Sequence, residues 1–279
     1  MTVVTRFLNE SEILQAAREM DAIYPRVAPI VLWRAWEVAA YRNHALTEPV
    51  LDLACGDGRF FRLLWPQVTD VVGIDYDQAA CENARASGVY KDVHQVPAHQ
   101  LPFEDHSFAS LFSNCALEHM DHIDEVLREA FRVLKPGGLF ISSVVTDKIV
   151  EWGMMPLLSR LFQAEKRGQE IWRDYENYHH YRNPFPSQEW MKRMENAGFQ
   201  ILEHTPIAPE PFGRIFMFFD EAWHFQLEGG AELGQPLHGY LMQLQNYSDG
   251  IGDILRGLIK LSPNPSVGAG AVFVAQKPK

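Results

Sequence analysis

Cysteine, basic charge and long apolar runs are all scarce in this sequence. The three cysteines among 279 residues include no Cys-x-x-Cys pair, which argues against a disulfide framework and a structural zinc site. The 25 basic residues are outnumbered by 36 acidic ones, so a nucleic-acid partner is not expected. The chain has no run of about 18 apolar residues, as a membrane span would need, and no basic and then apolar leader. These absences indicate a cytoplasmic protein without a membrane span.

What is present is the composition of an ordinary globular protein. Hydrophobic residues make up 47% of the chain and charged residues 22%. A chain of this length can form one large α/β domain with insertions. The composition leaves the oligomeric state open, a homodimer included.

Strand-like and helix-like segments alternate from residue 49 onward. Seven apolar and partly β-branched segments are expected to be strands, at residues 49–55, 68–77, 89–98, 106–117, 139–145, 199–205 and 270–278. Amphipathic segments between them are expected to be helices, and Pro136 and Gly137 are expected to end the third of these. This alternation indicates βαβ units and therefore a doubly wound α/β sheet. In such a sheet, ligands bind at the carboxyl ends of the strands, where the strand order reverses.

Three stretches depart from this alternation. Residues 1–47 have a helical pattern and are expected to form an N-terminal extension, with Arg34 as an exposed helix residue rather than a partner of a ligand carboxylate. Residues 48–279 are expected to form one domain whose core comprises 48–145, 187–205 and 268–279. The insertions 146–186 and 206–267 carry helices and many aromatic residues, and we expect them to form a cap over the site.

A glycine-containing turn follows the first expected strand, in the run LDLACGDGRF. Gly56 and Gly58 allow positive φ angles and a close approach of a ligand to the backbone. The helix that begins there offers free N–H groups to an anionic group. Asp75 ends the second expected strand, 19 residues after Gly56, where an acidic residue can bind ribose hydroxyls. Asp77 is better suited to cap the next helix.

The turn does not match the pattern of a dinucleotide site. The pattern Gly-x-Gly-x-x-Gly/Ala needs a small last residue so that helix and strand pack closely, and Phe61 stands there. This disfavours a pyrophosphate cradle and a nicotinamide oxidoreductase. A nucleoside ligand without a pyrophosphate fits the turn better.

Four segments together resemble the class I S-adenosylmethionine-dependent methyltransferases, especially their small-molecule, type 11-like group. They are VLDLACGDGRF, VVGIDYD, LPFEDHSFASLFSNCALEHM and FRVLKPGGLFISS. Their order and spacing are more specific than any one of them. The resemblance implies a Rossmann-like sheet of seven strands whose last strand is antiparallel, and GAVFVAQKP looks like that strand. It also implies S-adenosyl-L-methionine as the cofactor.

The resemblance further implies cofactor-binding roles for eight residues. The methionine moiety and the sulfonium would be lined by Asp52, Ala54 and Gly56. Asp75 would bind the ribose, while the adenine would be contacted by Tyr76, Ala98 and His99. The backbone of Asn114 would face the amino group of the cofactor. Two positions depart from the family pattern, because glycine is common at Ala54 and many relatives carry an aspartate at Pro97 that accepts from the adenine amino group.

His119 is the candidate catalytic base. It follows the fourth expected strand, at the ligand end of the sheet, and imidazole titrates near neutral pH. A purely structural role in the loop is the alternative, because the pair Glu118–His119 recurs in relatives with differing substrates. No cluster with the spacing of metal ligands is evident, so no metal is expected.

An aromatic stripe runs through the first insertion. Trp172, Tyr175, Tyr178 and Tyr181 recur every three residues, which predicts one slowly drifting face of a helix. This stripe either packs the insertion on the core or forms a wall of the acceptor pocket. In the second case Tyr175, Tyr178 and His179 would bind the substrate.

The expected activity is methyl transfer to O or N of a small-molecule metabolite, partly apolar metabolites included. A methyltransferase that acts on a protein, and a non-catalytic scaffold of the same fold, are the alternatives. The intact Asp52, Gly56 and Asp75 argue against a scaffold, and the acidic composition argues against RNA as the acceptor.

Overall fold

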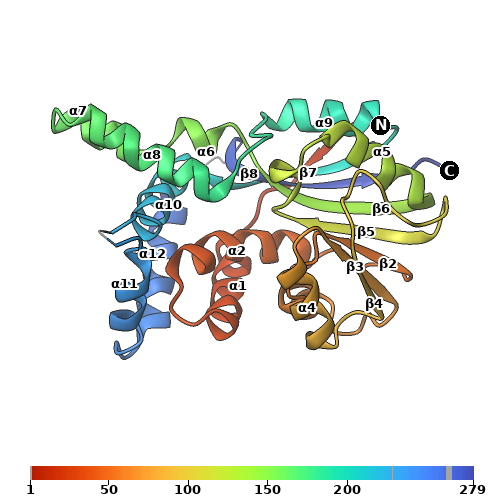
Figure 1. Cartoon of the computed structure of the whole chain (residues 1–279), viewed down its shortest axis with the longest axis horizontal. Coiled ribbons are helices and arrows are strands. Elements are labelled where there is room, and N and C mark those ends of the chain that lie inside the picture. The colour runs from red at the N-terminus through yellow and green to blue at the C-terminus, as the bar shows by residue number, and fades with distance from the viewer. Residues whose placement is uncertain (1, 228, 262–265) are drawn as a thin grey trace.

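One mixed sheet of eight strands forms the centre of the molecule (Figure 1). The computed structural model describes residues 2–227, 229–261 and 266–279. The strand order is β1-β7-β8-β6-β5-β2-β3-β4. The strands are β1 (Val4–Thr5), β2 (Val50–Leu53), β3 (Val71–Asp75), β4 (Asp92–Gln95), β5 (Phe108–Asn114), β6 (Leu134–Val145), β7 (Gln200–Pro209) and β8 (Gly268–Gln276).

Helices cover both faces of this sheet. Figure 1 shows α5 and α9 on one side and α1, α2 and α4 on the other, while α7, α8, α10, α11 and α12 extend beyond the end of the sheet. The helices are α1 (Glu10–Ile23), α2 (Ala28–Tyr41), α3 (Arg59–Leu64), α4 (Gln78–Ser87), α5 (Ile123–Val133), α6 (Lys148–Glu151), α7 (Met154–Leu161), α8 (Glu165–His179), α9 (Ser187–Asn196), α10 (Glu210–Trp223), α11 (Gly234–Leu241) and α12 (Tyr247–Lys260). None of the helices in the described residues is both long and apolar enough to cross a membrane.

The doubly wound α/β fold expected from the sequence is confirmed. Each of the seven expected strands is present, and β8 pairs antiparallel with both β6 and β7. The sheet has one more strand than expected, because Val4 and Thr5 pair in parallel with Glu203 and His204 of β7. A two-residue strand leaves no alternating pattern for the sequence to reveal.

Two expected boundaries were wrong. The prolines at 206 and 209 were assigned to the second insertion, but β7 continues to Pro209, opposite Gly268. Proline is tolerated there because the short β1 pairs with β7 only at 203 and 204, so the far edge of β7 needs no further donors. The third helix was expected to end at Pro136 and Gly137, yet α5 ends at Val133 and those residues belong to β6. Positions 228 and 262–265 of the second insertion lie outside the described residues.

Each face of the sheet has its own hydrophobic core, and the two cores are formed with different helices. Helices α5 and α9 pack on one face through Leu127, Trp190 and other buried side chains. On the opposite face, Val31 and Tyr41 of α2 share a core with Phe112 of β5 and with apolar residues of β7 and β8. The N-terminal extension therefore shares its core with the sheet.

We predict that Leu111→Ala lowers the free energy of unfolding by about 2–5 kcal/mol, because it opens a cavity in the core on β5. Leu111 is 0% exposed, whereas Leu161 at the end of α7 is 70% exposed and provides a matched control. Leu161→Ala is expected to change the free energy by less than about 0.5 kcal/mol. Urea denaturation of both variants measures the difference, and equal losses would contradict this assignment of the core.

Candidate active site

The strand order reverses between β2 and β5, and the turn after β2 lies at this reversal. Three residues of the turn have left-handed backbones, with φ angles of 66° at Ala54, 54° at Gly56 and 78° at Gly58. A Cβ atom at Gly58 would lie 2.6 Å from the ring of Tyr90, so glycine is required there for close packing as well as for conformation. Successive backbone N–H groups in such a turn form a concave site for an anionic group.

The Asp75 carboxylate ties this turn to the end of β3. Its Oδ2 accepts a hydrogen bond from the Gly56 backbone N–H at 3.0 Å, and its Oδ1 accepts one from the N–H of Asp77, also at 3.0 Å. Asp77 caps α4 as expected, since its Oδ1 accepts from the N–H of Ala80 at 2.7 Å. An ionised carboxylate has about four acceptor positions, so two on Asp75 remain for ligand hydroxyls.

Asp52, the buried carboxylic acid of β2, lies beneath the turn. The Tyr90 hydroxyl donates to its Oδ2 at 2.6 Å. Burial, reinforced by the negative charge of Asp75, raises the pKa of Asp52 to about 7. A positive charge in the turn would favour the ionised form of this acid.

Two cavities meet at Ala54. The larger, which we call the strand-end cavity, has a volume of about 490 Å³ and lies at the ends of β3, β4 and β5. Among its lining residues are Ala54, Asp75, Tyr76, Pro97, Ala98, His99 and His119. The smaller, the turn cavity, has a volume of about 230 Å³ and is lined by residues that include Arg34, Asp52, Ala54, Gly56 and Asn114.

These two cavities suit a nucleoside joined to an amino acid. The strand-end cavity offers the Asp75 carboxylate to ribose hydroxyls and an apolar slot to adenine. The turn cavity offers the buried acid of Asp52 to a cation and the guanidinium of Arg34 to a carboxylate. S-adenosylmethionine carries these groups in this order, with its sulfonium between them. The residues therefore fit this cofactor, and Ala54 would lie next to the sulfonium.

A third cavity, the cap cavity, lies between the sheet and the insertions and has a volume of about 330 Å³. Cys115 and His119 line both this cavity and the strand-end cavity, and Arg34 lines both this cavity and the turn cavity. Its aromatic lining comprises Trp33, Tyr178, Tyr181, Phe216 and Trp223. Its other polar groups come from His179, Asp220, His224 and Glu232.

The loop that carries His119 is fixed by the first insertion. Leu117–His119 form a short 3₁₀ helix after β5. The side-chain amide of Asn183 donates to the carbonyl oxygens of Leu117 and Met120, at 3.0 and 2.7 Å. The Tyr181 ring stacks on His119 at 5.4 Å between centroids. His119 Nδ1 is buried and has no hydrogen-bond partner among the described residues, while Nε2 lies 3.8 Å from Oε1 of the buried Glu118.

The structure brings together most residues that the sequence singled out. All eight candidate cofactor residues line one or both of the cavities that meet at Ala54. Asn114 lines the turn cavity, and its side-chain oxygen accepts from the Tyr41 hydroxyl at 3.0 Å. Arg34 was expected to be exposed, but it is half-buried and forms an ion pair of 2.6 Å with the buried Glu37. The individual binding roles stay predictions.

The aromatic stripe is divided between two environments. Tyr175 is 1% exposed, and its hydroxyl donates to Asp220 Oδ2 at 2.6 Å. Tyr178 and His179 line the cap cavity, and Tyr178 is 52% exposed. Tyr181 lies beyond the end of α8, so the expected single helical face was wrong in its last member. The helix ends at His179 because His180 adopts a left-handed backbone.

Several functional candidates were missed from the sequence. Glu37 supports Arg34 and also accepts from the Ser143 hydroxyl at 2.7 Å. Asp220 and His224 of the second insertion face His179 of the first, so only the fold unites them. The one local signal was the i, i+4 spacing of Asp220 and His224, which places both on one face of a helix. Burial, together with the charges of His224, His119 and His180, lowers the pKa of His179 to about 3 and keeps its imidazole neutral.

Comparison with known proteins supports the same assignment. Residues 51–142 match the family model of a methyltransferase domain. The ubiquinone/menaquinone biosynthesis C-methyltransferase of Bartonella tribocorum is 33% identical over 199 residues, which cover 63% of this chain and 74% of that protein. The chain belongs to the class I S-adenosylmethionine-dependent methyltransferases.

As a member of this family, the enzyme uses S-adenosylmethionine. The mitochondrial 2-methoxy-6-polyprenyl-1,4-benzoquinol methylase of Bos taurus is 35% identical over 141 residues, or 46% of this chain. The methyltransferase spans less than half the length of that curated relative, namely 41%. The geranyl diphosphate C-methyltransferase of Streptomyces coelicolor, solved with S-adenosyl-L-homocysteine, has the same fold with a TM-score of 0.52 at 12% identity, covering 89% of this chain and 79% of that one.

We predict that the methyltransferase binds S-adenosylmethionine more tightly as the pH rises from about 6 to about 8. The raised pKa of Asp52 means that its carboxyl is mostly protonated below pH 7 and ionised above it, and only the ionised form attracts the cationic cofactor. Binding should therefore release a proton, which calorimetry in buffers of different ionisation enthalpy measures. Asp52→Asn removes the titrating group, so its affinity should change little over this pH range. An equal pH dependence in both proteins would contradict the role of Asp52.

Proposed function

We propose that this enzyme methylates a small molecule that binds in the cap cavity. The observation that carries the proposal is the shared wall formed by Cys115 and His119, which line both the cap cavity and the strand-end cavity. An acceptor in the cap cavity would lie beside the sulfonium end of the cofactor at Ala54. The cap would thus hold the acceptor close to the methyl group of the cofactor and exclude water from both.

His119 is the proposed general base. When bound, S-adenosylmethionine supplies a methyl group that is already activated by the positive sulfur. The remaining task is to orient the acceptor and to remove its proton if it is a hydroxyl or an ammonium. His119 lines both cavities, and stacking on Tyr181 together with the Asn183 bonds to the loop holds its imidazole in position. These contacts support a base with a fixed orientation.

The lining of the cap cavity favours an acceptor with a flat apolar body and a protic group. Trp33, Phe216 and Trp223 offer aromatic surface, whereas His119, His179 and Glu232 offer hydrogen-bonding groups. Such a mixture suits an aromatic alcohol or amine, with the methyl group going to O or N. We propose this class of acceptor, and a soluble, cytoplasmic enzyme is consistent with it.

Transfer to carbon is a second candidate. The relatives from Bartonella tribocorum and Bos taurus are named as a C-methyltransferase of ubiquinone and menaquinone biosynthesis and as a benzoquinol methylase. A quinol also has a flat ring and protic oxygens, and loss of a proton from oxygen makes the adjacent ring carbon nucleophilic. The same base would therefore serve both outcomes.

The test begins with calorimetric titration of S-adenosyl-L-homocysteine. We expect micromolar binding, weakened roughly 10- to 100-fold in Asp75→Asn because charge-assisted hydrogen bonds are lost. Asp77→Asn is the matched control and should bind normally, since asparagine also caps a helix well. Transfer of a labelled methyl group to a panel of phenols, aromatic amines and hydroquinones follows, and NMR locates the methyl group on O, N or C. His119→Gln should lower kcat about 10²- to 10⁴-fold with unchanged cofactor affinity.

Three results would contradict the proposal. Absence of binding by S-adenosyl-L-homocysteine would favour a non-catalytic scaffold. Transfer to a purified protein but to none of the small molecules would favour a protein acceptor. Normal kcat in His119→Gln would exclude His119 as the base.

A further inference from the structure

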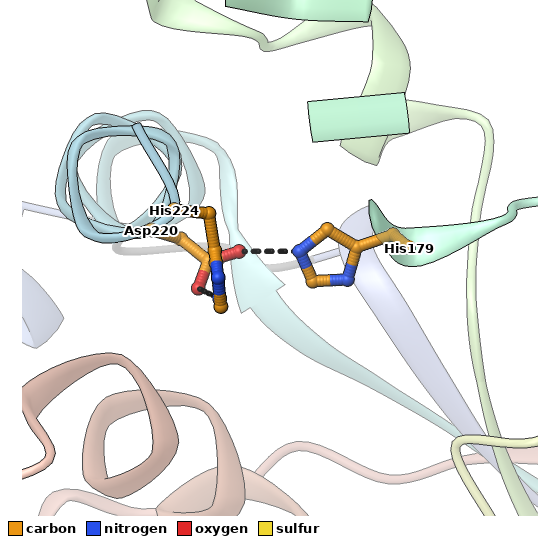
Figure 2. A group of neighbouring side chains, drawn as sticks. All are labelled: His179, Asp220 and His224. Carbon is orange, nitrogen blue, oxygen red and sulfur yellow. Dashed lines mark ion pairs between the residues drawn. The ribbon is translucent and has the colours of Figure 1, made fainter. Parts of the chain in front are cut away.

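Two imidazoles and a carboxylate converge at one end of the cap cavity. His179 ends α8, whereas Asp220 and His224 lie one turn apart at the end of α10. One ligand-type atom from each of the three lies within 4.8 Å of the others. Figure 2 shows the His179 ring pointing at the Asp220 carboxylate from the first insertion, with His224, which directly follows α10, beside that carboxylate.

These side chains do not satisfy one another by hydrogen bonds. His179 Nε2 lies 3.6 Å from Asp220 Oδ2, and His224 Nε2 lies 3.8 Å from Asp220 Oδ1. Both distances exceed those of a hydrogen bond. His179 Nε2 is buried and has no hydrogen-bond partner among the described residues. A buried polar atom of this kind costs free energy unless something else binds it.

The spacing matches that of ligands around a small cation. Two atoms bound about 2.1 Å from a tetrahedral metal ion lie roughly 3.4 Å apart. The two distances from histidine to Asp220 exceed this by a few tenths of an ångström, and all three ligand atoms lie within 4.8 Å of one another, so side-chain rotations would bring them into place. Two imidazoles and one carboxylate on one side of an ion, with the other positions open, form a ligand set known for divalent transition metals.

Two of the three side chains are also held by neighbouring polar groups of the kind that commonly orient metal ligands. His224 Nδ1 lies 3.4 Å from Glu232 Oε1, so the nitrogen that faces away from Asp220 is directed at a second carboxylate. The Tyr175 hydroxyl donates to Asp220 at 2.6 Å and fixes the orientation of the carboxylate. Imidazole ligands of metals commonly donate their other N–H to a carboxylate, which sets the tautomer and raises ligand basicity.

We propose that His179, Asp220 and His224 bind a divalent transition-metal ion. The expectation from the sequence was that no metal is bound, and this proposal departs from it. The two insertions supply all three ligands, so the ion would also join α8 to α10.

The open positions of the ion would face the cap cavity, because all three ligands line it. This second step rests on the proposed function. An acceptor hydroxyl could occupy one such position, and an oxygen bound to a divalent cation loses its proton more readily. The stacked rings of His119, Tyr181 and His179 run from the shared wall to the metal ligands, with centroid distances of 5.4 and 5.2 Å. The ion would thus orient the acceptor from the side opposite the cofactor.

The test uses Co²⁺ and Zn²⁺ alone with the full chain free of any histidine tag. Equilibrium dialysis measures the bound metal, and visible absorption reports Co²⁺ coordinated by nitrogen and oxygen. We expect one ion per chain, with affinity lowered at least about 100-fold in His179→Ala and in His224→Ala. Asp220→Asn keeps the shape of the side chain and is expected to lose metal without unfolding. Glu232→Gln should weaken binding by about 10- to 100-fold through His224.

The matched control is His180→Asn, next to His179. His180 is exposed and has a left-handed backbone, which asparagine tolerates. This variant should bind metal as the wild type does. Wild-type affinity in both His179→Ala and Asp220→Asn, or failure of the wild type to bind either ion, would overturn the site. Thermal unfolding of each variant shows whether a loss of metal is caused by misfolding. If the histidine variants misfold, the metal affinity of Asp220→Asn, which keeps the shape of the side chain, tests the site.

Two added ligands separate this inference from the proposed function. Catechol, an aromatic diol, should shift the absorption of the Co²⁺ form, and an unchanged spectrum would exclude an open position toward the cap cavity. S-adenosyl-L-homocysteine should bind to all of the metal-site variants with unchanged affinity. Cofactor binding without metal binding would contradict only the metal-site proposal. Metal binding without cofactor binding would contradict only the proposed methyl transfer.

Discussion

The hydrogen bond from the Gly56 N–H to the Asp75 carboxylate joins the ends of two neighbouring strands, β2 and β3, and the site is built around it. It holds a turn with three left-handed residues in one conformation, which an unsupported chain would rarely adopt. The turn sets the position of Ala54, where the strand-end and turn cavities meet. Loss of this bond would release both the nucleoside end and the amino-acid end of the site.

Two side chains beside this turn, Asp52 and Arg34, have their charge states set by buried surroundings that suit a cationic amino-acid ligand. Asp52 lies beneath the turn with a raised pKa, so the positive cofactor itself would ionise it. Arg34 at the opposite wall is held by Glu37, which is fully buried and accepts from Ser143. The methyltransferase therefore offers two charged side chains to the amino-acid moiety of the cofactor. Asp52, which ionises when the cationic cofactor binds, faces its positive charge, and the guanidinium of Arg34 faces its carboxylate.

The sheet, and the gathering of the candidate cofactor residues around two adjoining cavities, could be predicted because their signals are local. The strand–turn–helix run at 51–60 and Asp75 nineteen residues beyond Gly56 act through the backbone, and sequence spacing fixes that backbone. The cap could not be predicted in the same way. His179 lies 41 residues before Asp220 in the sequence, and only the packing of α8 against α10 makes them neighbours. Tyr175 similarly had a periodic signal but no sign that its hydroxyl would be directed at Asp220.

The most direct measurement is a crystal structure of the enzyme with S-adenosyl-L-homocysteine. It should show the adenosine in the strand-end cavity, both ribose hydroxyls within hydrogen-bonding distance of the Asp75 carboxylate, and the sulfur beside Ala54 facing the cap cavity. A nucleoside bound elsewhere, or one turned so that its ribose lies away from Asp75, would contradict the arrangement on which the proposed methyl transfer depends.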